Sequence, residues 1–533
     1  MTPRISHFVL IAAVLLVLNA CSSTAPRQDD GIQSYEPAPV EDVSKLQPDP
    51  FGLQRDPADR SLAEVKALSS SMVSYQPDLA LEIIRSLESL PSSQLNTLID
   101  QQNLDPEFTE WLELALQIRT VVIGGSSSAI AAEHWAKYHY GHVVDRSHFS
   151  ELVTNYRAYY PVPAQVAILL PTEGSLSTAA KAIRDGIMSA YLDQPGDAII
   201  RFYSSGEDSE SAIAAYQQAS YDGAMHIIGP LSINSTRSIA NLAEPATPIL
   251  LLNDMFSGNM LTEAGSDNQY ADIVHSLSLS TTEEATAIAL RALAQGQRAA
   301  IMMVPDSAWG KRIETAFRTT FEQGGGRIAA GARFNTAESD HSAMLTQLLK
   351  IDESKQRKTD LQAWLGVTLK FEPSQRNDYD FIFLAANPAE GRELKPLLRF
   401  HDAGHMPVYA MGRIYSGRMK RASDQDLNGI IFPTTRWQLQ AANKTARDAL
   451  DNTRLASVRG GAYGNLYALG QDAWHLLPWL PLMQKDPDLW FPGQIGSLRL
   501  QTDGSLYREP TWAQFSAGRP TAFQWPHTDG IQE

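Results

Sequence analysis

The 533 residues contain one cysteine, Cys21, which directly follows an N-terminal apolar run. The run covers Phe8–Leu18, and Arg4 supplies a positive charge ahead of it. A run of this length suits the core of a signal peptide and is too short to span a bilayer comfortably. Because the chain has no second cysteine, it can form no internal disulfide. We therefore expect its stability to come from the burial of apolar side chains.

The residues around the cysteine predict a lipid anchor. Leu18-Asn19-Ala20-Cys21 resembles the lipobox of bacterial lipoproteins. That resemblance implies cleavage after a signal peptide at residues 1–20, with acyl chains on the Cys21 thiol and on the new amine. Several acyl chains hold a protein at a membrane almost permanently. The alternatives are an ordinary secretory signal with a chance cysteine, or a short membrane anchor.

The residue after the cysteine and the net charge narrow the location and the partners. Ser22, rather than an aspartate, follows Cys21, a pattern that in Gram-negative lipoproteins resembles export to the periplasmic side of the outer membrane. Removal of residues 1–20 takes away Arg4 and no acid, so the formal charge of −16 becomes −17. So acidic a chain is a poor candidate for binding nucleic acid or anionic lipid headgroups. A protein partner with a basic surface remains compatible.

Composition divides the rest of the chain into three parts. Residues 21–50 hold the cysteine and a segment dominated by Pro, Ser, Asp and Gln, which predicts a flexible tether. Residues 51–160 predict an all-helical domain: Ser61 and Glu64 form a capping box, and Leu and Ile recur with helical spacing after Asp78. Short helices separated by Pro and Gly indicate stacked helical hairpins of the TPR-like kind.

Residues 161–533 show a different pattern, in which short apolar runs alternate with amphipathic segments. Such runs are typical of strands buried on both faces, and the alternation predicts parallel sheets in an α/β fold with two doubly wound lobes. The expected strands are 164–170, 198–203, 224–229, 248–253, 298–304, 327–334, 380–386, 408–411 and 429–432. The expected helices are 177–192, 209–221, 235–243, 309–323, 340–351 and 389–402.

Several motifs carry a resemblance to a known family. They are Val166–Gly174, Ala182–Ile187, Ile228–Leu231, Tyr463–Trp474 and Gly493–Leu500. With the two-lobe series they resemble the type I periplasmic binding protein fold, in which the chain crosses between lobes more than once. With the lipobox and the helical domain they resemble the LpoA family, outer-membrane lipoprotein activators of a class A penicillin-binding protein. The resemblance implies a peptidoglycan synthase as partner and no catalysis.

Two regions depart from the family's pattern. The helical domain is short for the family, and the stretch Asp352–Asp378, rich in Lys, Arg and Gln, looks like an insertion in the second lobe. Both departures bear on where a partner would make contact, so the contact surface is not predicted from the sequence.

Polar residues follow several of the predicted strands of the first lobe. They are Thr172, Ser175, Ser204, Ser205 and Asn253. The carboxyl ends of parallel strands are where α/β folds bind ligands, so these side chains could hydrogen-bond a small molecule in the cleft. The alternative is that they simply cap helices.

No pattern in the chain predicts catalysis, a cofactor or a metal site. There is no G-x-S-x-G elbow and no P-loop, and Glu283-Glu284 stands at an expected helix start, where it complements the helix dipole. The best metal candidate is interrupted by Gly141, which separates its members. It comprises His134, His139, His142, His148 and Asp145.

Three functions remain open. The first is the synthase activator, and the second is a tethered receptor for a small, amino-acid-like molecule. The third, an enzyme acting on wall material, has no supporting motif. A receptor for amino acids needs a charge clamp after the first strand, and Pro171–Ser175 contains no arginine, which favours the activator.

Overall fold

The chain is described from a computed structural model. The described residues are 57, 60–101, 105–193, 197–242, 244–255, 270–338, 340–442 and 463–526. They belong to one compact unit that begins at Arg55. Cys21, the predicted signal peptide and the predicted tether 21–50 lie outside the described residues.

The first part of this unit is helical, as predicted. The capping box is present: Ser61 Oγ accepts from the backbone N–H of Glu64, whose side chain accepts from the N–H of Ser61. Pro106 occupies the first turn of its helix, behind Asp105 as the cap. The helices are α1 (Leu62–Ser71), α2 (Pro77–Ser86), the 3₁₀ turn η3 (Leu87–Ser89), α3 (Ser92–Ile99), α4 (Pro106–Val122), α5 (Ser128–Tyr138) and α6 (Arg146–Tyr159).

Helix α3 was not predicted, because Pro91 was interpreted as the end of the preceding helix. In the structure Pro91 also stands at the N-cap of α3. The backbone N–H groups of Ser92 and Ser93 donate to the carboxylates of Asp486 and Asp488, at 3.0 Å each. The first N–H groups of this helix thus donate to side chains that lie about 394 positions further along the chain. No local sequence signal could show this.

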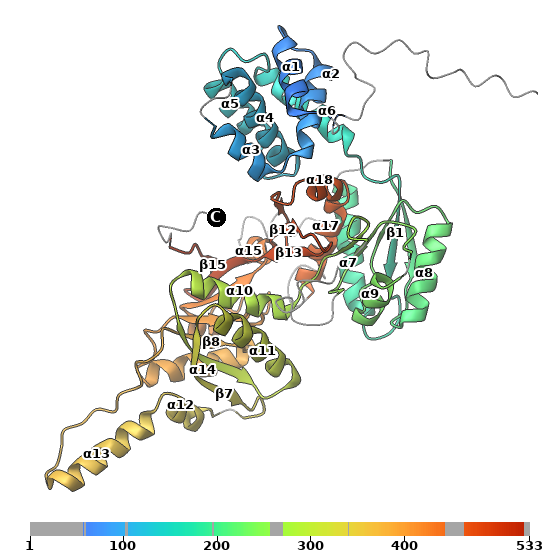
Figure 1. Ribbon diagram of the computed structural model, residues 1–533. Coiled ribbons are helices and arrows are strands. Elements are labelled where there is room, and N and C mark those ends of the chain that lie inside the picture. The colour runs from blue at the N-terminus through green and yellow to red at the C-terminus, as the bar shows by residue number, and fades with distance from the viewer. Residues whose placement is uncertain are drawn as a thin grey trace, which may run out of the picture. The chain divides into compact units, whose positions relative to one another are not determined.

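The first lobe is a five-stranded parallel sheet in the order β2-β1-β3-β4-β5. Side chains alternate across it: Val166, Ile168 and Leu170 pack into one core cluster, while Ala167 and Leu169 pack into another. Helices α7 and α8 lie on opposite sides of β1 (Figure 1). The elements are β1 (Gln165–Leu170), α7 (Ser177–Asp193), β2 (Ile199–Ser204), α8 (Ser209–Tyr221), β3 (His226–Ile228), α9 (Ile233–Ala240), β4 (Ile249–Leu251) and β5 (Val274–Ser276).

The second lobe is a seven-stranded sheet in the order β15-β14-β10-β9-β8-β6-β7. Strands β6 to β10 are parallel, and β14 and β15 add an antiparallel edge. The elements of its first pass are α10 (Thr281–Ala294), β6 (Ala299–Pro305), α11 (Ala308–Gln323), β7 (Arg327–Phe334), α12 (Ser342–Leu348), α13 (Ile351–Leu365), β8 (Phe381–Leu384), α14 (Pro388–Phe400), β9 (Val408–Ala410), η4 (Gly412–Ile414), η5 (Ser423–Leu427), β10 (Ile430–Thr434) and α15 (Arg436–Ala442).

After the second lobe the chain returns to the first and then crosses back. Helix α17 (Gly464–Leu476) packs closely on α7, and α18 (Leu480–Lys485) follows it. The three-stranded sheet C comes next, with β11 (Phe491–Pro492), β12 (Ser497–Leu500) and β13 (Leu506–Glu509), before β14 (Thr511–Ser516) and β15 (Arg519–Ala522) rejoin the second lobe. Repeated crossing between two α/β lobes is the architecture predicted above from the resemblance to type I periplasmic binding proteins.

Two glycines fix how closely α7 and α17 approach. A Cβ added at Gly186 would lie 2.0 Å from the carbonyl oxygen of Tyr467, and one at Gly470 would lie 2.1 Å from that of Ile183. The two backbones are therefore in direct contact, which only glycine permits at these positions. This crossing holds α7 firmly against α17.

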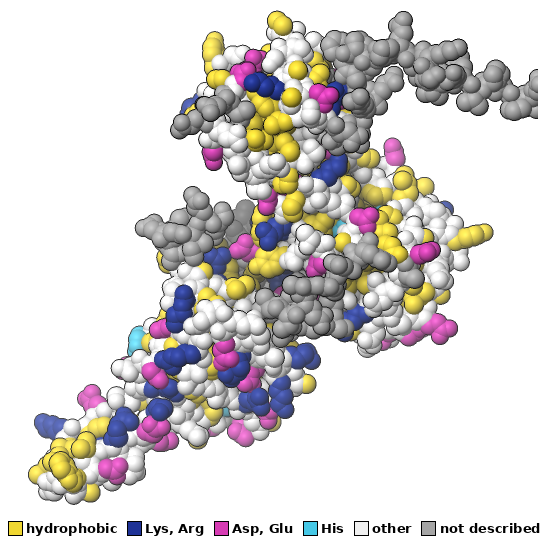
Figure 2. Space-filling view, viewed as in Figure 1, with side chains coloured by type: hydrophobic (Ala, Val, Ile, Leu, Met, Phe, Trp, Pro, Cys, Tyr) yellow, Lys and Arg dark blue, Asp and Glu magenta, His cyan; other side chains and the backbone are white. Residues whose placement is uncertain are grey.

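The helix predicted at 340–351 ends at Leu348 in the structure, and a separate helix, α13, begins at Ile351. Lys350 has a φ of 59°, a left-handed conformation that separates α12 from α13. Helix α13 then extends through the expected insertion, and its far end gathers exposed apolar side chains (Figure 2). The side chain of Trp364 is 82% exposed, with Leu361, Leu365 and Val367 also exposed beside it. The insertion is thus polar along most of its length and apolar at its tip.

None of the described helices combines the length and the apolar character that crossing a bilayer requires.

Candidate functional site

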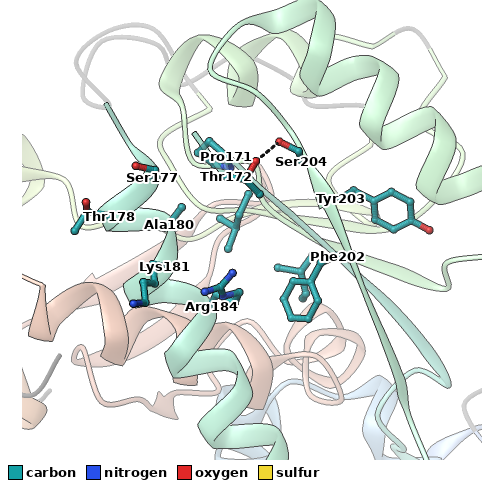
Figure 3. A pocket seen from close by; sticks show the side chains of 12 residues that line it. Pro171, Thr172, Ser177, Thr178, Ala180, Lys181, Arg184, Phe202, Tyr203 and Ser204 are labelled. Atoms are coloured by element: carbon teal, nitrogen blue, oxygen red, sulfur yellow. Dashed lines mark hydrogen bonds between the residues drawn. The ribbon is translucent and has the colours of Figure 1, made fainter. Parts of the chain in front are cut away.

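Two of the predicted hydroxyls meet at the carboxyl ends of neighbouring strands. Strands β1 and β2 pair in parallel with Leu170 opposite Ser204, so Thr172 emerges beside the end of β2. The Oγ1 atom of Thr172 lies 3.0 Å from the Oγ atom of Ser204, within hydrogen-bond distance (Figure 3). Both residues are exposed, so their remaining hydrogen-bonding capacity faces solvent.

The other three predicted residues have partners within the lobe. The Oγ atom of Ser175 donates to both carboxylate oxygens of Glu207 at 3.1 Å, and that carboxylate also accepts from the N–H of Leu176 at 2.6 Å. Ser205 is fully buried and donates to the carbonyl oxygen of Gly206. The amide of Asn253 donates to the carbonyl oxygen of Leu231 at 2.8 Å. These three side chains are therefore engaged in contacts within the lobe.

Thr172 and Ser204 line one end of a cavity of about 330 Å³. The cavity lies between α7 and the edge strand β2, with side chains of β1 as its floor (Figure 3). Its lining comes entirely from the first lobe. The lining residues are Ile168, Leu170, Pro171, Thr172, Ser177, Thr178, Ala180, Lys181, Arg184, Phe202, Tyr203 and Ser204.

Packing explains why this side of the sheet is open. Helix α8 packs against both β1 and β2 on its face of the sheet, whereas α7 packs against β1 and is held against α17. Strand β2 is the edge of the sheet, and the side chain of Phe202 remains 49% exposed. The aromatic ring of Phe202 and the side chain of Arg184 lie on the same side of β2, while Tyr203 points away (Figure 3).

The sequence analysis missed the two cations of this cavity. Lys181 and Arg184 are three residues apart, which places both on one face of α7. Both cations lie in the second and third helical turns of α7, beyond the loop that follows β1, so they were not among the polar residues predicted after the strands. Their helical spacing was visible, but only the edge position of β2 shows that this face stays open.

A second polar cluster joins the helical region to the end of the chain. The guanidinium of Arg119 and the carboxylate of Asp486 form an ion pair at 2.7 Å, and both side chains are almost wholly buried. Arg119 also donates to the carbonyl oxygens of Leu87 and Leu90, at 2.5 and 2.8 Å. Asp486 accepts in addition from the N–H and hydroxyl of Ser92. We call this set the Arg119–Asp486 junction.

The junction is extended by a second ion pair and a shared apolar core. Lys485 binds the carboxylate of Glu88 at 2.9 Å, and the Glu88 side chain is 1% exposed. The surrounding core cluster contains side chains of the helical region, of one face of the first lobe and of α18. The helical region is therefore fastened to the first lobe through the returning segment of the chain.

The acidic pair Glu283-Glu284 lies in the first turn of α10, as expected, behind the cap Ser280. Its role is wider than complementing the dipole. Glu284 accepts from the N–H of Gly412 at 2.5 Å, and Ser278 Oγ donates to Glu283 at 3.2 Å. Burial raises the pKa of Glu283 to about 7 and also raises the pKa of Glu284.

The histidines considered as metal ligands have separate local partners. The ring of His139 stacks on Trp135 with centroids 3.7 Å apart and lies 3.5 Å from the Glu113 carboxylate. His142 accepts from the N–H of Val144 through Nδ1, and burial lowers its pKa to about 4. Within the described ranges, no three His, Cys, Asp or Glu side chains are arranged to hold a metal ion.

Comparison with known proteins agrees with this architecture. Residues 57–518 match the family described as "LppC putative lipoprotein". The penicillin-binding protein activator LpoA of Vibrio antiquarius strain Ex25 is 24% identical over 469 residues, covering 86% of this chain and 74% of that protein.

Solved structures show the same fold. Full-length LpoA from Haemophilus influenzae superposes with a TM-score of 0.54 at 18% identity, covering 90% of this chain and 83% of that one. The C-domain of the same protein, described as a regulator of PBP1A, superposes with a TM-score of 0.52 at 19% identity and covers 68% of this chain and all of that one. Since the family match spans most of the sequence, the chain belongs to the LppC lipoprotein family, as an LpoA-type member.

Proposed function

We propose that this protein is an outer-membrane lipoprotein, anchored through Cys21 on the periplasmic side, that binds a class A penicillin-binding protein and stimulates its synthesis of peptidoglycan. In this proposal residues 1–20 are the signal peptide, and residues 21–50 are the lipidated cysteine and a tether. Residues 51–160 are the helical domain, and residues 161–533 are the bilobed domain. The protein itself catalyses nothing and uses no cofactor.

One observation carries the proposal. The match to an activator of penicillin-binding proteins covers 86% of the chain, so it includes the helical region as well as both lobes. A receptor of the periplasmic binding protein kind needs only the two lobes. The retention of a helical region joined to the first lobe by a buried ion pair and a shared core favours a protein that works as one continuous body between an anchor and a partner.

Stimulation requires only that the protein bind the active state of the synthase more tightly than the inactive state. A difference of about 1–3 kcal/mol in binding free energy changes the equilibrium roughly five- to 150-fold. No chemistry within this chain is needed. The buried Arg119–Asp486 junction would limit motion between the two parts, so that binding energy acts on the partner.

The tip of α13 is the first surface to test for contact with the synthase. Trp364 is 82% exposed at the end of a helix that bears other exposed apolar side chains. Clustered exposed apolar side chains commonly mark sites of protein interaction, and tryptophan is enriched among the residues that dominate binding energy. We propose that this tip inserts into an apolar recess of the synthase.

The proposal is tested with the chain from residue 21 and the periplasmic part of a class A synthase. We expect direct binding in a pull-down and a faster rate of crosslinking in a synthesis assay. Absence of both would contradict the activator function. Export and anchoring are tested separately, by mass spectrometry of Cys21 and by membrane fractionation of wild type and Cys21→Ser.

The contact surface has a matched pair of variants. Trp364→Ser should weaken synthase binding by about tenfold or more, as expected for a central aromatic contact. Phe400→Ser removes an aromatic side chain of equal exposure, 81%, from α14 of the same lobe and should leave binding unchanged. Equal effects of the two variants would reject the α13 tip while leaving the activator function standing.

A second candidate function is a tethered receptor for a small molecule, which the cavity beside β2 favours. Thr172 and Ser204 line that cavity and remain candidate ligand contacts, whereas Ser175, Ser205 and Asn253 are hydrogen-bonded within the lobe. An amino acid fits the cavity poorly. The lining contains two cations and no carboxylate, so nothing in it would balance the charge of an ammonium group.

A further inference from the structure

The cavity between α7 and β2 combines an apolar interior with two cations at its rim. The buried side chains of Ile168, Leu170 and Ala180 form its interior, and Phe202 forms the wall on the side of β2. Lys181 and Arg184 stand exposed on α7, one turn apart, and both line the cavity; the Arg184 side chain points toward Phe202, whereas that of Lys181 points away from it (Figure 3). At about 330 Å³ the space lies at the lower end of the range of roughly 300–1,000 Å³ for small-molecule sites.

These two cations are less tightly paired than several other basic residues of the chain. Arg291, Arg376 and Arg392 bind carboxylates at 2.9, 2.6 and 2.6 Å. The carboxylate nearest to Arg184 is that of Asp185, at 3.9 Å, and no hydrogen bond joins them. Lys181 has no ion pair with any of the described residues. Within the part of the chain that the structure describes, the two cations beside the cavity are therefore only loosely paired.

We propose that this cavity binds a small organic anion that carries a compact apolar body. The carboxylate of the ligand would bind Arg184, with the positive charge of Lys181 close by on the same helix, and its apolar body would lie against Phe202 and the floor from β1. Charge-assisted hydrogen bonds from a guanidinium and an ammonium favour a carboxylate, and the apolar interior rewards burial of the body. The hydroxyls of Thr172 and Ser204 add donors at the end of the cavity.

The site is distinct from contact with a synthase. All the lining residues fall between positions 168 and 204, so the cavity needs neither the second lobe nor the α13 tip. Loss of the anion site would therefore leave synthase binding intact. Conversely, a failure of the activator function would not affect binding of a small anion to this cavity.

Three probes separate the contributions of charge and of the apolar body. 4-Phenylbutyrate carries both, 4-phenylbutan-1-ol carries the same body without charge, and acetate carries the charge without the body. Binding to the chain from residue 21, with Cys21→Ser, is measured by ligand-observed NMR titration. We expect the alcohol and acetate each to bind about tenfold or more weaker than phenylbutyrate, the equivalent of one good polar contact.

The variants assign the binding to this cavity. Lys181→Gln with Arg184→Gln should weaken phenylbutyrate about tenfold and leave the alcohol unchanged. Phe202→Ser should weaken both. The control, Lys311→Gln with Arg312→Gln, removes the same two charges from the exposed side of α11 and should change neither. Circular dichroism confirms that each variant is folded.

Several results would overturn the proposal. Wild-type chain that binds no phenylbutyrate up to about 10 mM has no such site, since that limit corresponds to less than about 3 kcal/mol of binding. Equal affinities for the acid and the alcohol would reject a role for the cations. A loss in the α11 control equal to that of the α7 variant would show attraction by overall charge alone.

Discussion

Basic side chains serve opposite purposes in two regions of this molecule. At the Arg119–Asp486 junction the guanidinium is buried, paired at 2.7 Å and bonded to two carbonyl oxygens. Beside β2, Lys181 and Arg184 are exposed and line an apolar cavity, and the one ion pair between them and the described carboxylates is that of Arg184 with Asp185 at 3.9 Å. The comparison teaches that burial and saturation of a charge indicate a structural role, whereas a spare charge beside an open apolar surface indicates capacity to bind.

The junction should produce the largest effect on stability. Asp486→Ala leaves the Arg119 guanidinium buried without a counter-charge, which costs about 3–5 kcal/mol. We expect the midpoint temperature of the unfolding transition that includes the helical region to fall clearly. Calorimetry measures this temperature. Asp426→Ala, which removes an exposed partner 4.0 Å from Arg399, should change stability by less than about 1 kcal/mol. Similar losses of stability in the two variants would contradict a structural role for the buried ion pair.

The second test concerns why the cavity is open. Gly186→Ala places a Cβ 2.0 Å from the carbonyl oxygen of Tyr467, so α7 and α17 must separate. Overpacking of this kind costs about 1–3 kcal/mol. We expect reduced thermal stability together with altered phenylbutyrate binding, because α7 carries both cations. Ser189→Ala, in the same helix, should change neither property. Normal stability in Gly186→Ala would show that the crossing does not hold α7 in place.

Much of this fold could be predicted because the residues that determine it are neighbours in the sequence. The buried run at 164–170, the capping box of Ser61 and Glu64, and Pro106 at a helix start all express preferences of neighbouring residues, and each appears in the structure as expected. The end of the helix expected at 340–351 was displaced because Lys350 adopts a left-handed conformation that its sequence neighbours do not announce.

What could not be predicted depends on residues far apart in the chain. Helix α3 takes part of its N-terminal capping from Asp486, and Arg119 finds its counter-charge at that same residue. The cavity is open because β2 is an edge strand and because Gly186 and Gly470 draw α7 to α17. The predicted hydroxyls of Thr172 and Ser204 lie beside it, but its cations emerged only from the packing.

Glu283 is an intermediate case: its carboxyl group is partly buried and accepts a hydrogen bond from Ser278. Burial raises its pKa from 4.5 to about 7, so the folded chain holds this proton to a higher pH than the unfolded chain does. Its protonated form therefore favours folding at low pH, and that contribution is lost as the pH rises from about 4.5 to about 7.

Glu283→Gln should remove this pH-dependent loss of stability. We expect the variant to be more stable than wild type at pH 8, by about 1 kcal/mol once partial exposure is allowed for, and equally stable near pH 4. Thermal unfolding at several pH values gives the measurement. Glu210→Gln, an exposed position in the first turn of α8, serves as the control and should change the stability at pH 8 by less than about 0.5 kcal/mol. A profile unaltered by Glu283→Gln would show that this carboxylate is as well solvated as a surface group.

The variant that should weaken anion binding is expected to have the smallest effect on stability. Lys181→Gln with Arg184→Gln breaks no ion pair shorter than 3.9 Å and exposes no buried group, so the unfolding free energy should move by less than about 0.5 kcal/mol. Removing two nearby positive charges even relieves their mutual repulsion. Calorimetry of this variant beside Asp486→Ala therefore tests the comparison directly. A destabilisation approaching that of Asp486→Ala would mean that the two cations already have a structural task, and that they are not free to receive an anion.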